Sequence, residues 1–231
     1  QVYINGQKVG YWPYGYNSFH FDITKYLKPG EKNTLAVRLE NLPESSRWYP
    51  GAGLYRNVHL IITEDAYIPV WGTYITTPSV NEKFAKVNVR TKVVLPEGAD
   101  PAKYSVETSV WNPNKQKLTA VRTSLAQMKY NNNQAEQEFV IQAPSLWSPE
   151  MPALYSAETR LYEGDKLKDI YTTPFGIRSI EIIPDKGFFL NGKRTVFKGV
   201  CNHHDLGPLG AAVNDAAIRR QIRILKDMGC N

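Results

Sequence analysis

The chain has 231 residues, of which 42% are hydrophobic and 22% charged, the composition of an ordinary globular protein. The length favours two domains, or two domains and parts of others. No apolar run approaches the roughly 20 residues that a membrane-spanning helix needs. The net charge of +6 comes from 28 basic and 22 acidic residues spread along the chain. No basic stripe accompanies an RNA- or DNA-binding motif, so neither a membrane nor a nucleic acid is expected as a partner.

Two cysteines, Cys201 and Cys230, are too few for a disulfide framework. They are expected at opposite ends of a strand–helix unit, too far apart to form a bridge. We expect both to be buried thiols rather than ligands or nucleophiles. The cellular compartment and the oligomeric state stay open, a homo-oligomer included.

The front of the chain, up to about residue 65, has the pattern of short strands and turns. Asn5-Gly6 stands within residues 2–10, which predicts a hairpin closed by a two-residue turn. Apolar and polar residues then alternate over residues 19–22, 35–40 and 58–62. A period of two indicates strands with one apolar face, so we expect an all-β domain.

A second all-β block follows, over residues 66–178. Its clearest strand is predicted at residues 85–95, where Val87, Val89 and Val93 share one face. Further strands are expected near residues 72–76, 104–111, 118–125, 137–142, 155–162 and 167–173. About seven short strands over roughly one hundred residues indicate an immunoglobulin-like β-sandwich, here without the Cys pair of antibody domains.

The periodicity changes after residue 178. Asn191-Gly192 predicts another hairpin turn, and residues 195–200 have the pattern of a strand that is buried on both faces. Asn214 is a good N-cap for a helix, and Gly229 stands where a helix C-terminus favours a left-handed residue.

One strand, one loop and one helix with Ile218, Ile222 and Leu225 on a single face form one β/α unit. By itself such a unit cannot bury its faces. We therefore expect the chain to be a segment of a longer protein, an interpretation supported by a first residue, Gln1, that is not an initiator Met.

Motifs along nearly the whole chain resemble those of family 2 of the glycoside hydrolases, especially its β-galactosidases, and occur in the family order. They include VYING (2–6), FDIT (21–24), SRWYPGAGLYRNV (46–58), LWSP (146–149), FGIR (175–178), KGVCNHHD (198–205) and LKDMGCN (225–231).

The resemblance implies a mainly β architecture of three parts. Residues 1–65 would be the C-terminal part of a jelly-roll-type sugar-binding sandwich that is truncated at its N-terminus. Residues 66–178 would form the immunoglobulin-like sandwich. Residues 179–231 would begin a TIM-barrel catalytic domain, of which only the first β/α unit is present.

The active site of a TIM barrel lies on loops at the C-terminal ends of its strands. His203, His204 and Asp205 directly follow the first predicted barrel strand, where imidazole and carboxylate groups can meet sugar hydroxyls. The resemblance implies that His203 binds the sugar near the scissile bond. Asp205 is the second candidate, since a carboxylate accepts two hydroxyl hydrogen bonds. A hydrogen-bonded network at the strand end, or a metal site, are the other interpretations, although zinc-like ligand spacing is missing.

Arg47 and Trp48 belong to a loop that reaches towards the barrel in this family. Trp48 offers a face on which a sugar can stack, and Arg47 offers donors for hydroxyl oxygens. Some relatives carry an acidic sugar-contacting residue about where Arg47 stands, so a structural role remains open for it. For Trp48, packing between domains is favoured over stacking.

Family members hydrolyse β-glycosides with retention, using one carboxylic acid as proton donor and one carboxylate as nucleophile. The resemblance implies that both lie on later barrel strands, and no Glu from Glu31 to Glu181 is assigned either role. It implies an exo-acting enzyme, most closely a β-galactosidase acting on terminal β-D-galactosides, with a carbohydrate as its partner and no cofactor. No residue of this chain is assigned to a metal, and the metal requirement of the full-length enzyme stays open. The alternatives are a β-glucuronidase, a β-mannosidase, and a non-catalytic carbohydrate-binding or adhesion module.

Overall fold

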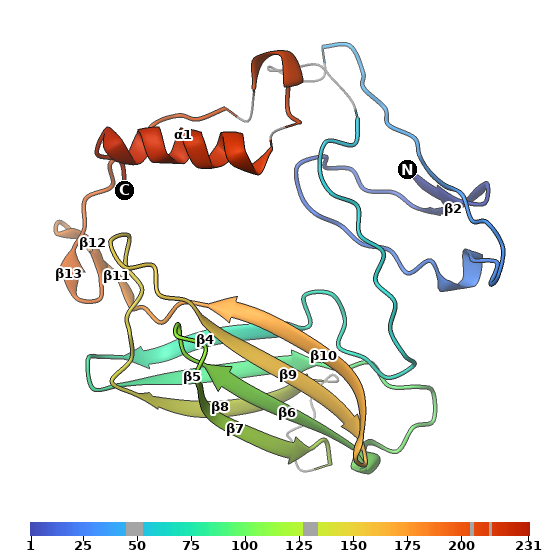
Figure 1. Ribbon diagram of the computed structural model, residues 1–231, viewed down its shortest axis with the longest axis horizontal. Helices are drawn as coiled ribbons and strands as arrows, with labels where there is room; N and C mark the ends of the chain where they lie inside the picture. Colours follow the sequence, from blue (N-terminus) through green and yellow to red (C-terminus); the bar gives the residue numbers. More distant parts are fainter. Residues whose placement is uncertain (45–52, 127–133, 204–205, 213) are drawn as a thin grey trace. The chain divides into compact units, whose positions relative to one another are not determined.

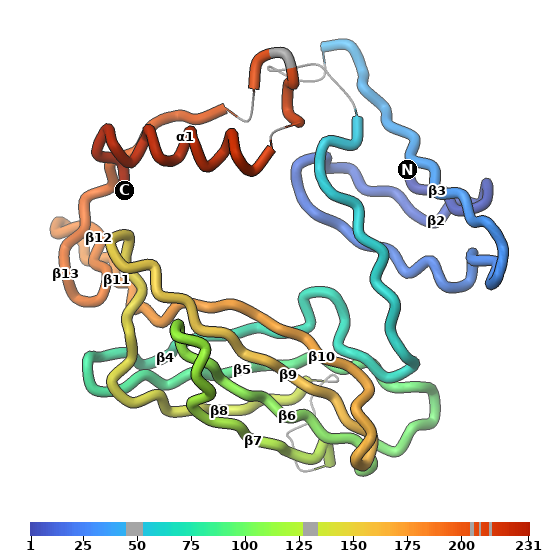
Figure 2. Tube along the Cα trace, viewed as in Figure 1, coloured from blue at the N-terminus to red at the C-terminus, as the bar shows by residue number. Residues whose placement is uncertain are grey.

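The computed structural model describes residues 1–44, 53–126, 134–203, 206–212 and 214–231. The chain forms two compact units, one of residues 1–59 with 203–218, the other of residues 60–202 with 219–231. Figures 1 and 2 show that β-strands dominate and that there is a single α-helix of any length in the described part. The expected mainly β class is therefore confirmed.

Within residues 1–59, the first unit contains a three-stranded antiparallel sheet and the 3-10 turn η1 (Thr24–Tyr26). Its strands are β1 (Val2–Ile4), β2 (Gln7–Gly10) and β3 (Leu35–Val37), in the order β2-β1-β3. Asn5 and Gly6 have φ angles of 51° and 81°. Positive φ at both central positions defines the type I′ turn that suits a hairpin. The predicted hairpin is thus confirmed, while a jelly roll stays a prediction.

Two predicted strands of the front region do not form. Residues 19–22 and 58–62 belong to no strand, and Leu60 and Ile62 are 69% and 85% exposed. Alternation tells which side chains would share a face, but a strand also needs partners for its backbone N–H and C=O groups. No strand of the described part pairs with either segment.

All seven strands predicted for residues 66–178 are present. They are β4 (Thr73–Val80), β5 (Phe84–Lys92), β6 (Tyr104–Trp111), β7 (Lys117–Ser124), β8 (Gln134–Gln142), β9 (Tyr155–Glu163) and β10 (Lys166–Phe175). A short 3-10 turn, η2 (Pro101–Lys103), precedes β6. Period-two patterning succeeded here because each strand finds a ladder partner.

These strands form two antiparallel sheets, with the orders β4-β5-β8 and β10-β9-β6-β7. The two sheets lie in separate layers in Figure 1. The chain leaves the first sheet after β5, builds β6 and β7 in the second, and returns for β8. Crossing between layers in this way is the Greek-key pattern of immunoglobulin-like sandwiches.

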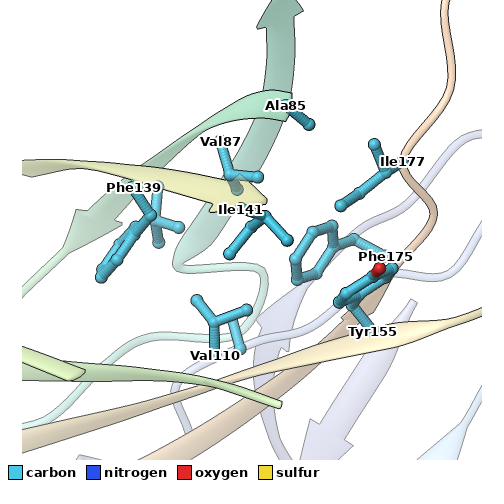
Figure 3. Close-up of a cluster of buried hydrophobic side chains, with 10 residues drawn as sticks. Ala85, Val87, Val110, Phe139, Ile141, Tyr155, Phe175 and Ile177 are labelled. Atoms are coloured by element: carbon cyan, nitrogen blue, oxygen red, sulfur yellow. The ribbon is translucent and has the colours of Figure 1, made fainter. Parts of the chain in front are cut away.

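The core between the sheets consists of two clusters of buried apolar side chains. Figure 3 shows the first, in which Val87 and Phe139 from one sheet meet Val110 and Tyr155 from the other. The second contains residues nearer the start of β6: Ala66, Ile68, Val93, Tyr104, Val106, Leu125, Ala135 and Leu161. Full burial of one such side chain stabilises the fold by about 1.5–3 kcal/mol, so the sandwich has a core of its own.

Lys168 ties the segment before the sandwich to β10. Its side chain is only 6% exposed, and its Nζ lies 2.5 Å from Glu64, 3.0 Å from Asp65 and 3.7 Å from Glu163. Hydrogen bonds from Lys168 hold the pKa of both Glu64 and Asp65 below their ordinary values, and these two carboxylates raise the pKa of Lys168. A largely buried ammonium is tolerated because it is surrounded by acidic partners.

After the sandwich a small sheet follows, in the order β11-β12-β13. Its strands are β11 (Ile180–Ile183), β12 (Gly187–Leu190) and β13 (Lys193–Arg194). Asn191 and Gly192 have φ angles of 51° and 75°, so the predicted hairpin turn is confirmed as a second type I′ turn.

The strand predicted at residues 195–200 is not formed. These residues make no sheet, and Phe197 is 71% exposed. A strand covered on both faces needs a neighbour on each side, and no described strand lies beside this one. Cys201 and Cys230 form no disulfide, as expected, but Cys201 is exposed and Cys230 half-exposed rather than buried. The TIM barrel stays a prediction.

The predicted helix is confirmed as α1 (Asp215–Asp227). The Asn214 Oδ1 accepts the N–H of Ala217 at 2.9 Å, which makes Asn214 the N-cap. At the other end Gly229 has φ of 95° and Cys230 donates its N–H to the Leu225 carbonyl, the hydrogen bonding of a Schellman motif. None of its residues is buried. No helix in the described part is long and apolar enough to cross a membrane.

Candidate functional site

Of the five residues predicted to contact sugar, the structure describes one. His203 is exposed and lies in the loop between residues 195–202 and α1. Arg47, Trp48, His204 and Asp205 lie outside the described residues. Their proposed sugar contacts therefore stay predictions.

The loop that follows His203 is a compact turn. Residues Gly207–Leu209 form the 3-10 turn η3, and the Leu206 N–H donates to the Gly210 carbonyl at 3.0 Å. Gly207 and Gly210 have φ angles of 57° and 54°, which residues with a Cβ rarely adopt. The reversal brings the chain to Asn214, the N-cap of α1, within a few residues.

Asn231 holds the segment that leads into this loop. Its backbone N–H donates to the Lys198 carbonyl at 3.0 Å, and its Oδ1 accepts the Lys198 N–H at 2.8 Å. Its Nδ2 also donates to the Val196 carbonyl at 3.0 Å. One asparagine thus satisfies three backbone groups of a segment that has no strand partner. The end of the helix and the entry to the loop are joined through it.

A second asparagine joins the small sheet to the sandwich. Asn191 donates its N–H to the Ser179 carbonyl and accepts the Ser179 N–H on Oδ1, both at 3.0 Å. Its Nδ2 donates to the Trp147 carbonyl at 3.0 Å. The start of the predicted barrel is thereby attached to the end of the sandwich by defined hydrogen bonds.

The Trp147 side chain is held from two sides. The Arg178 guanidinium lies over its ring, 4.8 Å from the centroid, and Gly176 is so close that a Cβ there would lie 3.1 Å from the Trp147 Cβ. With Leu154 and Pro174 these residues line a hollow of about 290 Å³. Trp147 belongs to the LWSP motif, and Gly176 and Arg178 belong to FGIR. Both motifs are visible in the sequence, but neither predicts that the two pack together.

Four acidic groups of the described residues have a clearly shifted pKa, and in each it is lowered: Asp22, Glu64, Asp65 and Glu150. In Glu150 the causes are hydrogen bonds from its own backbone N–H and from the Ser148 side chain. A general acid needs the opposite shift, towards neutrality. The lowered pKa values therefore do not suit these four residues to the role of proton donor.

No metal centre is formed by the part of the chain that the structure describes, since it holds no group of three or more His, Cys, Asp or Glu side chains close enough to bind an ion. The interpretation of the His-His-Asp run as a metal site is not tested by this result, because His204 and Asp205 are outside the described residues.

Comparison with known proteins gives three consistent results. Residues 67–178 match the sequence profile of the Glycosyl hydrolases family 2. The chain is 44% identical over 232 residues to the β-galactosidase BoGH2A of Bacteroides ovatus, and 33% identical over 243 residues to a β-glucuronidase of Bacteroides fragilis. The fold superposes with a TM-score of 0.88 and 36% identity on the crystal structure of a family 2 glycosyl hydrolase from Bacteroides cellulosilyticus.

The similarities to the two named relatives and to the solved structure extend over the whole of this chain, but over only part of each of those proteins. The chain spans 27% of the B. ovatus protein, 34% of the B. fragilis protein and 30% of the B. cellulosilyticus structure. The motifs in the sequence, the relatives and the solved structure all indicate the same family.

Proposed function

The chain belongs to family 2 of the glycosyl hydrolases, and we propose that it forms part of a retaining, exo-acting β-glycosidase that hydrolyses terminal β-D-galactosides. The observation that carries this proposal is the 44% identity, over the whole chain, to a protein named β-galactosidase. The sandwich and the segment after it supply the scaffold of the sugar site in this proposal. A carbohydrate is the partner, and no cofactor takes part.

Retention requires two carboxyl groups on opposite sides of the glycosidic bond, one as general acid and one as nucleophile. No carboxyl group of this chain is proposed for either role. The lowered pKa values of Asp22, Glu64, Asp65 and Glu150 support leaving these four out as the general acid, because a carboxyl group that is already ionised has no proton to donate. Glutamates of later barrel strands would supply both roles.

The chain's own contribution to substrate binding is proposed to be His203, with Asp205, His204, Arg47 and Trp48 as further contacts. His203 is exposed, which supports a role in contact with a ligand. An imidazole can donate one hydrogen bond and accept another, which suits a pair of neighbouring sugar hydroxyls.

A β-glucuronidase is the second candidate, because the B. fragilis relative at 33% identity carries that name. A β-mannosidase is the third, on architecture alone. The glucuronide differs from the galactoside by the configuration at C4 and by a carboxylate at C6. A site for it needs a cationic partner that a galactoside site does not, and the two activities can be separated by assay.

The test uses the full-length gene product and nitrophenyl β-galactoside, β-glucuronide and β-mannoside. We expect the largest kcat/KM for the galactoside, with retention of anomeric configuration in the first product seen by NMR. Turnover of the glucuronide alone would transfer the proposal to the second candidate. Inactivity on every nitrophenyl β-glycoside, together with sugar binding by residues 1–178, would instead favour a carbohydrate-binding module.

A further inference from the structure

A hollow of about 210 Å³ lies on the sandwich, away from the junction at Trp147. It is lined by Trp71, Gly72, Tyr74, Arg90, Lys92 and Gln134. Four of these residues belong to β4, β5 and β8, and they alternate with inward residues such as Val89 and Ala135, which are fully or almost fully buried. The hollow is therefore on the outer face of the β4-β5-β8 sheet. Neither the fold nor the proposed sugar site assigns a function to this hollow.

Trp71 stands at the edge of this hollow in a costly conformation. Its φ is 57°, in the left-handed region that bulky side chains avoid, and its side chain still leaves 59% of its surface exposed. Such a backbone angle strains a bulky residue, and it occurs in turns as well as at functional sites. The turn itself is fixed, because the Trp71 N–H donates to the Tyr171 hydroxyl at 3.1 Å. The position would suit glycine, and a large exposed indole occupies it.

Tyr74 and Arg90 form a prepared cationic group beside Trp71. The Arg90 guanidinium lies over the Tyr74 ring, 4.6 Å from its centroid. Stacking on an aromatic face restricts the guanidinium while its N–H donors stay available at the edge. Lys92 is the next outward residue on the same strand and brings a second positive charge to the hollow.

The carboxylates on the same face of the sheet have other partners. Glu136, which is opposite Arg90 in the ladder, accepts a hydrogen bond of 2.6 Å from Asn88. Glu138 pairs with Lys86 at 3.4 Å. Within the described ranges, no carboxylate lies within ion-pair distance of Arg90 or Lys92. The hollow thus combines the exposed Trp71 side chain with two cationic groups that have no acidic partner in that part of the chain.

We propose that this hollow is an accessory binding site for an anionic saccharide. A sugar ring stacks on Trp71, its carboxylate or sulfate group accepts hydrogen bonds from Arg90 with Lys92 close by, and the Gln134 amide can meet a hydroxyl group. Arg binds planar oxyanions through two parallel donors, which a neutral sugar does not exploit. None of its lining residues is among those proposed for the sugar site, and it rests on the proposed function only for the choice of saccharides as ligands.

The experiment is isothermal titration calorimetry on the 231-residue chain, with three probes: oligogalacturonate, a sulfated galactan oligosaccharide and the neutral galactan oligosaccharide of the same length. We expect binding of at least one anionic probe and none of the neutral one, and which of the two binds tells carboxylate from sulfate. Arg90→Gln should weaken binding by roughly tenfold or more, as expected for a lost charge-assisted hydrogen bond. Lys83→Gln, in the turn between β4 and β5, removes the same charge outside the hollow and should change nothing.

Trp71→Gly separates a binding role from a structural one. Glycine tolerates φ of 57°, so we expect an unchanged or higher unfolding midpoint together with the loss of saccharide binding. The proposal is overturned if neither anionic probe binds, or if the neutral probe binds equally well. It is also overturned if Lys83→Gln weakens binding as much as Arg90→Gln, or if Trp71→Gly lowers the midpoint. Activity of the full-length protein does not enter these outcomes.

Discussion

The Asn191 side-chain amide donates a hydrogen bond of 3.0 Å to the backbone carbonyl of Trp147, 44 residues earlier in the chain. The same residue exchanges two hydrogen bonds with Ser179. An asparagine side chain carries the donor and the acceptor of a peptide group. One residue can therefore continue a β-ladder on one side and begin a contact on the other.

The pattern recurs twice. Asn5 exchanges two hydrogen bonds with Thr34 and donates Nδ2 to the Tyr26 carbonyl. Asn231 does the same with Lys198 and Val196. In all three places the partner is an extended segment at the edge of a sheet or outside any sheet. These asparagines satisfy backbone groups that short or missing strands would leave unpaired.

Replacing Asn191 should show how much this junction contributes. Asn191→Gly keeps the tolerance for φ of 51° but loses the side-chain hydrogen bonds to Ser179 and Trp147, and we expect a loss of about 1–2 kcal/mol. Asn191→Ala adds the cost of a Cβ in a left-handed conformation, a further ~1 kcal/mol. Urea denaturation of the 231-residue chain measures both. Equal stability of the two variants would contradict the part assigned to the backbone angle.

Gly176 offers a test of the packing on Trp147. A Cβ at residue 176 would lie 3.1 Å from the Trp147 Cβ and Cγ, so Gly176→Ala must displace the indole, and we expect a loss of about 1–3 kcal/mol. Gly199→Ala is the matched control, because Gly199 has no neighbour within 4 Å. It should be neutral or slightly stabilising. Urea denaturation with tryptophan fluorescence follows both variants, and a neutral Gly176→Ala would mean that the ring yields without cost.

The sandwich could be predicted from the sequence because each of its strands is both patterned and paired. The valines on one face of residues 85–95 predicted β5. In the structure β5 pairs with β4 on one side and β8 on the other, and these valines are buried. The same reasoning failed at residues 58–62 and 195–200. Their apolar residues favour burial of one face. The sequence of a strand does not specify which other strand its backbone will pair with, and that pairing is missing here.

Caps and turns were predictable for a different reason. The Asn-Gly turns at residues 5 and 191, Asn214 and Gly229 act through local backbone angles and short-range hydrogen bonds, which a few neighbouring residues determine. The hollow at Trp71 was not found, because its lining comes from three strands. No single segment carries both the aromatic and the cationic residues, and only the strand order unites them.

The ion cluster at Lys168 predicts how stability depends on pH. The pKa values of Glu64 and Asp65 are lowered, so their contribution is present above their ordinary values of 4.5 and 3.8 and is lost as the pH falls through the lower folded-state values. The pKa of Lys168 is raised, so its contribution is present below its ordinary value of 10.5 and is lost only above that, as the pH rises through the folded-state value. Lys168→Met should therefore destabilise the chain most between pH 4.5 and pH 10.5, and less at acidic pH.

Urea midpoints of the wild type and Lys168→Met across that pH range measure the effect. Lys166→Met is the control, because Lys166 is 66% exposed and lies 3.5 Å from Glu64, so solvent screens its interaction. The control should change stability far less. A difference between wild type and Lys168→Met that stays constant from neutral pH to below 3.8 would show that burial of the alkyl chain, and not the charges, is what matters.

The role proposed for His203 can be tested in the full-length gene product. His203→Ala removes an exposed imidazole from the loop, and if that group binds a sugar hydroxyl near the scissile bond, kcat/KM for nitrophenyl β-galactoside should fall by about tenfold to a thousandfold. His203→Gln keeps a donor and an acceptor and should recover part of the loss. His59→Ala is the control, since His59 is also exposed and has no proposed role. Equal kcat/KM for His203→Ala and the wild type, with unchanged protein stability, would remove His203 from the sugar site.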